Sequence, residues 1–311
     1  MTNQFAAYNL SQPILDALTL LGYTTPTPIQ EAVIPAALNG RDIAARSQTG
    51  TGKTLAFAVP ICEKAVWEEN LPQALVLEPT RELAVQVSRE LFQVGRKKRL
   101  KVPAVFGGFP IDKQIRTLKQ KSHIVVGTPG RVMDHLRRGS LCLSTVRFLV
   151  IDEADLMLDM GFLEDVQQIL SMLPNHRTTF LFSATLDGRV QELTEAAVSE
   201  AVFISMEDEV KAPPAIEQSV YQVLQEEKYG GFKNILIKEN PDRCMIFCGT
   251  REMVNVLFQK LRRDRIFCGM IHGEMEQAER LKHVDAFRQG GFRYLIATDV
   301  AARGIDFEGI S

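Results

Sequence analysis

The sequence predicts an α/β protein made of two doubly wound lobes, each built around a parallel sheet. Short apolar runs recur along the chain, and each is followed by a turn and then by a helical pattern. Most runs are apolar at every position, as expected for strands buried on both faces of a parallel sheet. Alternation of such strands with helices is typical of the doubly wound architecture. The predicted strands are Ala74–Leu77, Ile124–Val126, Phe148–Ile151, Thr179–Phe182, Val202–Ile204, Met245–Phe247 and Tyr294–Ala297, with a weaker one at Val220–Leu224.

The chain length favours two domains, because 311 residues exceed one ordinary domain. The segment Met206–Gln218 breaks the rhythm of strands and helices. It is acidic and then carries Pro213 and Pro214, which hold a chain extended. We therefore expect a first lobe at residues 1–205, a linker at 206–218 and a second lobe at 219–311. The second lobe has fewer strand signals than the first, so we expect it to be incomplete at the C-terminus.

Composition is that of a soluble globular protein, with 45% hydrophobic and 24% charged residues. No apolar run approaches the roughly 18 residues of a membrane span, and the first residues do not form a secretory signal. The five cysteines lack metal-site spacing, which favours buried free thiols in a reducing cytoplasm. We therefore predict a cytoplasmic, monomeric protein without a membrane span. The net charge of −2 gives no global basic field, so any contact to a nucleic acid would be local.

Nearly every cluster of polar residues lies directly after a predicted strand. In open parallel sheets, ligands bind at the carboxyl ends of the strands. The chemistry of this protein is therefore expected along one edge of each sheet. The clusters are Glu78–Ala84, Gly127–Arg131, Asp152–Asp155, Ser183–Thr185 and Thr298–Asp306.

The segment Ser47–Thr54, S-Q-T-G-T-G-K-T, has the spacing of a phosphate-binding loop, although a serine replaces the first glycine of the general pattern. Gly50 and Gly52 let the backbone turn its N–H groups toward phosphate oxygens, and the helix that follows adds the positive end of its dipole. Lys53 is expected to reach the β- and γ-phosphates, and the Thr54 hydroxyl to ligate Mg²⁺. The alternative is a glycine-rich turn before a helix.

Asp152 and Glu153 begin a D-E-A-D run directly after an apolar strand. Asp152 suits the acidic second anchor of a Mg²⁺ site, directly or through water. Glu153 is then placed to accept a proton from an attacking water. Carboxylates also favour the start of a solvated helix, and the presence of Lys53 upstream on the same lobe is what favours catalysis.

Gln30 lies upstream of the phosphate loop in the run T-P-I-Q. Its amide offers a donor and an acceptor, which complements the edge of adenine. Tyr23 or Phe5 could cover the face of the base. The alternative is a loop glutamine beside a core aromatic residue, and composition does not decide between the two.

These motifs, in this order, resemble the DEAD-box ATP-dependent RNA helicases of superfamily 2, in their bacterial form. About ten short signatures follow the order of the family, from Phe5 to the last residues. They are the aromatic Phe5, the Q motif Gly22–Gln30, motif I Ala45–Thr54, motif Ia Pro79–Ala84, the doublet Gly107-Gly108, motif Ib Thr128–Arg131, motif II Asp152–Asp155, motif III Ser183–Thr185, motif IV Ile246–Cys248, the Q-x-x-R element of Gln277 and Arg280, and motif V Thr298–Asp306.

The resemblance implies two RecA-like lobes and a role for each matched residue. Ser183 and Thr185 would couple the nucleotide state to strand separation, and Asp306 would touch the ATP ribose. Arg303 would be a further RNA-side or interlobe contact, while His272 is expected to be a satisfied histidine at a strand end. The implied residues are, for catalysis, Glu153, Asp152, Lys53, Ser183 and Thr185; for ATP, Phe5, Tyr23, Gln30, Ser47, Gln48, Thr49, Gly50, Thr51, Gly52, Lys53, Thr54 and Asp306; for Mg²⁺, Thr54 and Asp152; and for RNA, Thr80, Arg81, Gly107, Gly108, Thr128, Gly130, Arg131, Gln277, Arg280 and Thr298.

The resemblance also implies a mechanism. ATP and single-stranded RNA would bind across the cleft between the lobes, each favouring the other. The bound RNA is bent, which is incompatible with a duplex, so a few base pairs open locally. Contacts to the backbone and the 2′-hydroxyls would make the protein selective for RNA but largely blind to sequence. The prediction is an RNA-dependent ATPase that unwinds short duplexes or remodels RNA–protein complexes.

The sequence departs from the family at its end, where the H-R-x-G-R-x-x-R element of motif VI does not occur. Such arginine fingers contribute roughly 10³–10⁵ in rate at related phosphoryl-transfer sites. We therefore expect a fragment of a longer protein, or a natural truncation, with weak ATP hydrolysis. Two alternatives stay open. One is a catalytically impaired clamp for ATP and RNA, and the other is a DNA helicase on the same scaffold, against which Gln30 and Asp152–Asp155 argue by resemblance.

Overall fold

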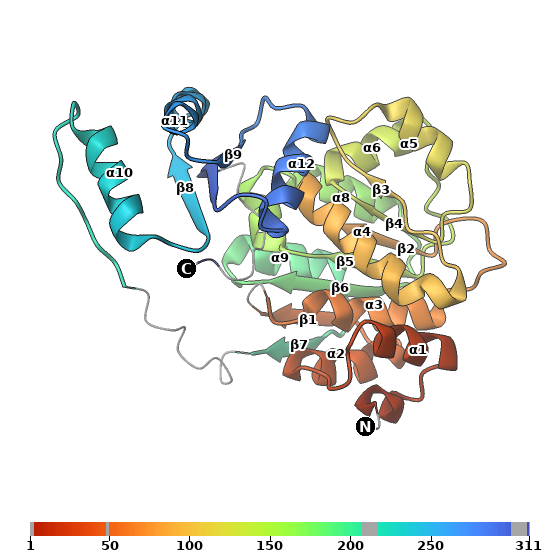
Figure 1. The fold of residues 1–311 in the computed structure, drawn as a ribbon. Helices are drawn as coiled ribbons and strands as arrows, with labels where there is room; N and C mark the ends of the chain where they lie inside the picture. Colours follow the sequence, from red (N-terminus) through yellow and green to blue (C-terminus); the bar gives the residue numbers. More distant parts are fainter. Residues whose placement is uncertain (1–2, 48–49, 207–216, 300–309, 311) are drawn as a thin grey trace. The chain divides into compact units, whose positions relative to one another are not determined.

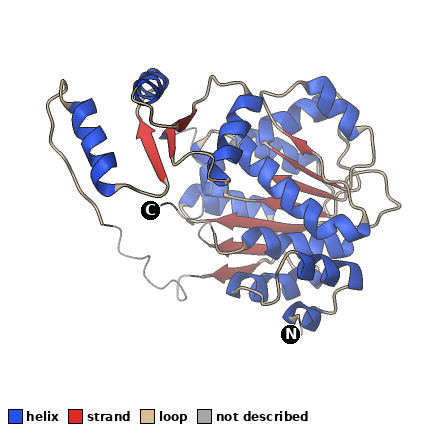
Figure 2. Ribbon diagram, in the orientation of Figure 1, coloured by secondary structure: helices blue, strands red, loops and turns tan. Residues whose placement is uncertain are grey.

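The computed structural model describes residues 3–47, 50–206, 217–299 and 310. The chain divides into two compact units, Met1–Val210 and Lys211–Ser311. Each unit holds a parallel sheet packed between helices, which confirms the predicted α/β class with two parallel-sheet lobes (Figure 2). Most of the predicted linker lies outside the described residues, so the predicted domain boundaries stay a prediction.

The sheet of the first unit has seven strands in the order β3-β4-β2-β5-β6-β1-β7 (Figure 1). Every neighbouring pair is parallel. The strands are β1 Ile43–Arg46, β2 Ala74–Leu77, β3 Ala104–Val105, β4 Ile124–Gly127, β5 Phe148–Ile151, β6 Thr178–Ser183 and β7 Val202–Ser205.

The central strands are apolar at every position because both of their faces are buried. Successive residues of a strand point to opposite faces of the sheet. Ala74 and Val76 accordingly join one hydrophobic cluster, while Leu75 and Leu77 join the other. Helices α1 to α4 contribute to the first cluster and α6 to α9 to the second, so the sheet lies between two layers of helices.

Local capping fixes where several of these helices begin. Thr27 and Gln30 form a capping box at the start of α2, with Pro28 at its first position. Thr80 and Asp187 accept backbone N–H groups at the starts of α4 and α9. The helices are η1 Gln4–Tyr8, α1 Gln12–Leu20, α2 Pro28–Leu38, α3 Lys53–Lys64, α4 Arg81–Gly95, η2 Arg96–Lys98, α5 Ile111–Leu118, α6 Pro129–Arg137, α7 Ala154–Asp159, α8 Leu163–Met172 and α9 Gly188–Ala197.

The second unit has a smaller sheet of three parallel strands in the order β8-β10-β9. Leu295 and Ala297 of the central strand face one hydrophobic cluster, and Ile296 faces the other. The elements are α10 Lys228–Glu239, β8 Cys244–Cys248, α11 Arg251–Arg263, β9 Cys268–Ile271, α12 Gln277–Arg288 and β10 Tyr294–Thr298. Within the described residues of both units, no helix has the length and apolarity to cross a membrane.

All seven of the stronger predicted strands occur, but β1, β3 and β9 were not predicted. Strand β1 reads I-A-A-R and has one large apolar residue, β3 has two residues, and β9 is interrupted by Gly269. The weaker strand predicted at Val220–Leu224 is wrong. No described strand pairs with that segment, and Val220 is 98% exposed, because apolar residues form a strand only beside a hydrogen-bonding neighbour.

The prediction of buried free thiols is wrong for one cysteine. Cys62 and Cys248 are buried, and Cys244 and Cys268 are half-buried. Cys142 is exposed, because it lies in the loop between α6 and β5 rather than in an element of the core.

Lys98, in the 3₁₀ turn after α4, connects this turn to the end of α3. Its ammonium donates to the carbonyl oxygens of Cys62, Glu63 and Ala65 at 2.9, 2.6 and 2.8 Å. A cation is favourable at the C-terminus of a helix, where carbonyls lack partners within the helix. We expect Lys98→Met to lower the free energy of unfolding of the first unit by about 1–2 kcal/mol, since hydrogen bonds from charged groups contribute a little more than that.

Urea unfolding followed by tryptophan fluorescence measures this change, because Trp67 is the only tryptophan and lies in the first unit. Lys97→Met is the matched control, since Lys97 is the neighbouring lysine of the same turn and is exposed. Equal unfolding midpoints for the two variants would contradict the role given to Lys98.

Candidate functional site

The predicted site residues of the first unit lie along one edge of the sheet, where the strands end. The register places Arg46 of β1 beside Ser183 of β6, and Leu77 of β2 beside Gly127 of β4 and Ile151 of β5. These strands are consecutive in the sheet, so the loops that follow them are neighbours as well. The fold thus brings the phosphate loop, the acidic run and the predicted RNA motifs of this unit to one edge.

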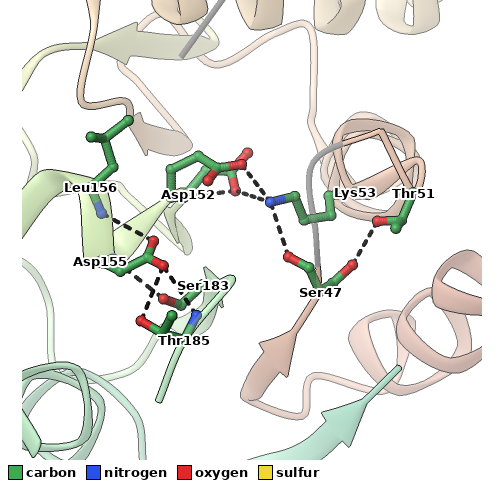
Figure 3. A network of polar contacts seen from close by, with 9 residues as sticks. Ser47, Thr51, Lys53, Asp152, Asp155, Leu156, Ser183 and Thr185 are labelled. Carbon is green, nitrogen blue, oxygen red and sulfur yellow. Dashed lines mark hydrogen bonds and ion pairs between the residues drawn. The ribbon is translucent and has the colours of Figure 1, made fainter. Parts of the chain in front are cut away.

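The phosphate loop leaves β1 at Ser47, which is buried. The Ser47 N–H donates to the carbonyl of Ser183 at 2.9 Å, and its hydroxyl lies 2.6 Å from the hydroxyl of Thr51 (Figure 3). These contacts fix both sides of the loop to the end of the sheet. Two predicted loop residues, Gln48 and Thr49, lie outside the described residues.

Two glycines shape the loop where it turns into α3. Gly50 and Gly52 have φ angles of 84° and 93°, which glycine adopts without steric cost. A Cβ on Gly52 would come within 2.6 Å of Nε2 of Gln30. Gln30 donates to the Gly52 carbonyl at 3.1 Å, and the Thr27 hydroxyl donates to the Thr51 carbonyl at 3.0 Å. The Q motif is therefore connected directly to the phosphate loop.

The predicted adenine contacts differ in accessibility. Gln30 is 3% exposed. Its Oε1 accepts the Thr27 N–H at 3.0 Å at the start of α2, and its Nε2 donates to the Gly52 carbonyl of the phosphate loop, so both ends of the amide already have partners. Phe5 is fully buried, with its ring at 76° to that of Tyr8, and it presents no face to a ligand. Tyr23 is 42% exposed. The adenine contacts stay a prediction, and Tyr23 is the better placed of the two aromatic candidates.

Lys53, the first residue of α3, faces the acidic pair that follows β5 (Figure 3). Its Nζ lies 2.6 Å from Oε1 of Glu153, 3.7 Å from Oδ1 of Asp152 and 3.4 Å from the carbonyl oxygen of Ser47. All three charged side chains are buried, so solvent screens them little. Burial opposes the charge on Lys53, but the two carboxylates outweigh it and raise the pKa of the ammonium.

Glu153 is held in a constrained turn. Its φ of 48° lies in the left-handed region, which is uncommon for residues other than glycine. Its N–H donates to Oδ1 of Asp152 at 2.9 Å, which ties the two acids together. Burial raises the pKa of the Glu153 carboxyl and the charge of Asp152 adds to the rise, while Lys53 opposes it. A raised pKa makes this carboxylate a stronger base, as expected for a proton acceptor.

The donor set around Asp152 fits Mg²⁺ that is shared with phosphates. Within the described residues, no three His, Cys, Asp or Glu side chains are grouped so that they could hold a metal. Mg²⁺ is usually held by one or two carboxylates together with substrate phosphates and water. Asp152 and the hydroxyl of Thr54, next to Lys53 at the start of α3, would supply the protein share of such a site, and both ligands stay a prediction.

Asp155, to which the sequence motifs gave no separate role, connects the acidic run to the end of β6. Its Oδ2 accepts the backbone N–H of Thr185 at 3.0 Å and the Thr185 hydroxyl at 3.1 Å (Figure 3). Its own N–H donates to the Ser183 hydroxyl at 3.3 Å. Ser183 and Thr185 therefore contact Asp155 rather than Lys53, which suits a coupling role better than direct catalysis.

Several of the predicted RNA residues form a second cluster at the same edge. The guanidinium of Arg81 lies against Gly107 and Gly108, and a Cβ on Gly108 would collide with it. Gly108 has a φ of 75°, which also favours glycine. Arg131 donates to the carbonyl of Phe109 at 2.9 Å, so both arginines are held beside the same glycine-containing loop.

The two predicted RNA-binding threonines occupy helix starts. The Thr80 hydroxyl accepts the Leu83 N–H at 3.3 Å and caps α4. Thr128 is the N-cap of α6, with Pro129 at the first helical position, and Gly130 follows in the first turn. Capping of α4 is sufficient to explain why a threonine occupies position 80, and the RNA contacts of both threonines stay a prediction.

The second unit carries the remaining described candidates. Gln277 and Arg280 are buried in the first turn of α12, and Thr298 ends β10. His272 follows β9, and its Nδ1 has no hydrogen-bond partner among the described residues. The expectation of a satisfied histidine is therefore wrong for this atom, because the ring is buried and no described group lies within hydrogen-bonding distance of Nδ1. Arg303 and Asp306 lie outside the described residues.

Glu78, to which no motif assigned a role, is the most unusual group at the edge of the first unit. It directly follows β2, its side chain is 0% exposed, and neither carboxyl oxygen has a hydrogen-bond partner among the described residues. Burial raises the pKa of Glu78 well above its ordinary value, and the charges of Asp152 and Glu153 add to the rise, while Lys53 opposes it. A glutamate directly after a fully apolar strand is the only signal of this group in the sequence.

A parallel sheet that presents a glycine-rich loop, a buried lysine and an acidic pair at its carboxyl edge defines the class of P-loop nucleotide-binding proteins. Comparison with known proteins narrows this class. The family model of DEAD/DEAH box helicases matches residues 27–193, and that of the helicase conserved C-terminal domain matches residues 227–311. The chain belongs to the family of DEAD-box ATP-dependent RNA helicases.

The curated relatives are bacterial. The chain is 51% identical to ATP-dependent RNA helicase DbpA of Bacillus subtilis over 99% of its own length and 64% of that protein. It is 41% identical to DEAD-box ATP-dependent RNA helicase CshA of Geobacillus kaustophilus, over 99% of this chain and 66% of that one. The chain therefore spans less than two thirds of the length of these relatives.

The fold also matches solved structures of the family. S. cerevisiae Dbp5 bound to RNA and ADP BeF3 has a TM-score of 0.88 and 30% identity, over 100% of this chain and 79% of that one. A DEAD box protein from Methanococcus jannaschii has a TM-score of 0.63 and 38% identity, over 96% and 80% of the two chains.

Replacement of Glu78 is expected to change how stability depends on pH. Folding raises the pKa of this carboxyl above the unfolded value of about 4.5, so its contribution is fully present below that pH and is lost as pH rises through the folded pKa. Glu78→Gln does not titrate. The variant should gain stability relative to the parent as pH rises from about 5 to 8, by up to about 1.4 kcal/mol per pH unit.

Urea unfolding of both proteins, followed by Trp67 fluorescence across this pH range, measures the difference. Glu192→Gln, at an exposed carboxyl on α9, is the matched control. Parallel stability profiles for Glu78→Gln and the parent would show that the Glu78 carboxyl is not held in its protonated form by folding.

Proposed function

We propose that this chain binds ATP with Mg²⁺ and single-stranded RNA, and uses RNA-dependent ATP hydrolysis to open short RNA duplexes. The observation that carries the proposal is the buried contact of Lys53 with Glu153 and Asp152 beside the phosphate loop. The relatives are named ATP-dependent RNA helicases, and the solved Dbp5 relative is bound to RNA and ADP BeF3, which supports the same ligands for this chain.

Lys53 and Glu153 divide the chemistry between them. The ammonium of Lys53 is buried and charged, and its present partners are the two carboxylates and the Ser47 carbonyl. Phosphates of ATP in the loop would offer Lys53 a stronger partner, which releases the carboxylate of Glu153. Glu153 would then accept a proton from the attacking water. Mg²⁺, held through Asp152 and Thr54, would neutralise charge on the phosphates.

The contact between Asp155 and Thr185 would transmit the state of this site. Asp155 lies two residues after Glu153, and it holds the end of β6 by two hydrogen bonds to Thr185. A shift of the acidic run on ATP turnover would therefore move the loop after β6. On the RNA side, Arg81 and Arg131 would hold phosphates, because arginines are suited to this contact.

Phosphate release from ATP, with and without single-stranded RNA, tests the proposal. We expect RNA to stimulate turnover and Glu153→Gln to lower it about 10²-fold or more, since a general base contributes about 10²–10⁴ in rate. ATP binding should persist in Glu153→Gln, because Lys53 and the phosphate loop are unchanged. Glu164→Gln, at an exposed carboxyl on α8, is the control and should retain the rate of the parent.

Three other outcomes would contradict the proposal. Turnover that is unaffected by Glu153→Gln would remove this residue from catalysis. Equal stimulation by DNA of the same sequence would indicate a helicase without selectivity for RNA. Cooperative binding of ATP and RNA without any turnover would indicate a clamp instead of a motor.

A further inference from the structure

Five cations gather at the amino end of the first-unit sheet, opposite the edge that carries the phosphate loop. Four of them belong to the run R-K-K-R-L-K after α4, and all four are exposed. The fifth belongs to the loop before β4. We call this set the distal basic patch, and its members are Arg96, Lys97, Arg99, Lys101 and Lys121. Lys98, also in the run, is excluded because its ammonium is bonded to the end of α3.

Contacts between two distant segments assemble the patch. The His123 N–H donates to the Lys101 carbonyl at 3.0 Å, and the Lys101 N–H donates to Nδ1 of His123 at 2.9 Å. His123 in turn stacks on Trp67 at 5.0 Å between ring centroids. The ammonium of Lys121 lies 4.3 Å from the centroid of the same tryptophan ring and donates to the Trp67 carbonyl at 3.2 Å.

The cations of the patch have no carboxylate as a direct partner. Within the part of the chain that the structure describes, none of its five cations forms an ion pair with a carboxylate. No acidic residue occurs between Glu90 and Asp112. The whole chain has 36 basic and 38 acidic residues, so this is a local excess of positive charge on a protein that is nearly neutral overall. Such an excess attracts a polyanion and gives binding that depends on salt.

The position of the patch relates it to the predicted RNA contacts. Helix α4 begins with Arg81 at the carboxyl edge and ends at the patch, at the side from which the strands start (Figure 1). The helix has 15 residues, so its two ends are roughly 22 Å apart. One strand of a duplex carries one phosphate for about every 3.4 Å of helix axis, so on that scale this length corresponds to roughly six or seven nucleotides.

We propose that the distal basic patch binds the phosphates of RNA that continues beyond the strand held at Arg81. The first unit then contacts one RNA at both ends of α4, and the second contact adds affinity without reading sequence. The inference rests on the proposed function, which supplies RNA as the ligand. A continuous RNA explains both basic clusters of this helix, whereas an acidic protein would explain the patch alone.

Trp67 provides a local reporter of occupation, because it is the only tryptophan and lies under the ammonium of Lys121. A phosphate that binds between Lys101 and Lys121 should draw the ammonium away from the ring and change the fluorescence. A strand of about four nucleotides should fill the contact at Arg81 without spanning the roughly 22 Å to the patch, whereas one of about twenty should reach both.

The test measures RNA affinity against salt concentration with strands of these two lengths. The patch variant replaces Arg96, Lys97, Arg99 and Lys101 by Gln and leaves Lys121 as part of the reporter. The matched control removes four exposed cations elsewhere on the chain. These are Arg137, Lys238, Arg262 and Arg263, each replaced by Gln.

With the longer strand, the patch variant should reduce the slope of log affinity against log salt by up to about 3, since each phosphate contact of a single strand contributes about 0.7. Its slope with the short strand should equal that of the parent. The longer strand alone should change Trp67 fluorescence, and the patch variant should lose that change. The control variant should behave as the parent with both strands. Lys97→Gln alone should lower the slope by about 0.7, which keeps the test valid if the fourfold variant folds poorly.

Several results would overturn the inference. Equal salt slopes for the patch variant and the control would show that only net charge matters. If the patch variant reduced the salt slope equally for the short and the long strand, the patch would belong to the first RNA contact instead of lying beyond it. A Trp67 response to an acidic peptide that exceeds the response to RNA would assign the patch to a protein partner. Absence of binding of the short strand by the parent would instead contradict the proposed function, and the inference with it.

Discussion

The buried ion pair between Lys53 and Glu153 is the contact on which the candidate site depends. Taking two charges out of water costs several kcal/mol per ion, and attraction repays this only when the geometry is good and other polar groups assist. Here the assistance comes from the chain itself. Asp152 adds a second carboxylate, the Ser47 carbonyl adds an acceptor, and the left-handed turn at Glu153 aims the pair. An apolar core of equal volume would be as stable, so function is the simplest reason to retain these charges.

Burial, together with the same group of charges, explains why the pKa of Glu78 is raised. One buried ammonium faces three buried carboxyl groups, and two of these lie within 3.7 Å of it. A third ionised carboxylate would have no hydrogen-bond partner and two like charges nearby. Protonation of Glu78 removes that cost. Lys53 and the acidic run therefore set the balance of charge at this edge, and this balance affects the pKa of Glu78.

The sequence predicted the fold class and seven strands because apolar runs buried on both faces leave a strong pattern. It did not predict β1, whose alanines are small, or β3, which has two residues. Val220–Leu224 is the opposite case, a predicted strand that does not form. Its residues favour a strand, but no described strand pairs with it. At the site, motif spacing predicted Lys53, Asp152 and Glu153 as a group, and the structure brings the three side chains together. The role of Asp155 and the isolation of Glu78 depend on contacts between strands far apart in the sequence, which spacing does not reveal.

The short segment between β2 and α4 offers a physical route between the two halves of the site. Glu78 begins this segment, and burial and the charges of the acidic run raise its pKa. Arg81, the first residue of α4, follows the segment and lies against the glycine doublet. The Thr80 cap fixes the start of α4, and the Glu78 N–H donates to the Gly127 carbonyl of β4 at 2.9 Å. Any shift of this segment would therefore move Arg81 and the whole of α4. Because α4 is a continuous helix, the movement would extend to the distal basic patch at its other end, so both proposed RNA contacts would respond to the charge at the nucleotide site.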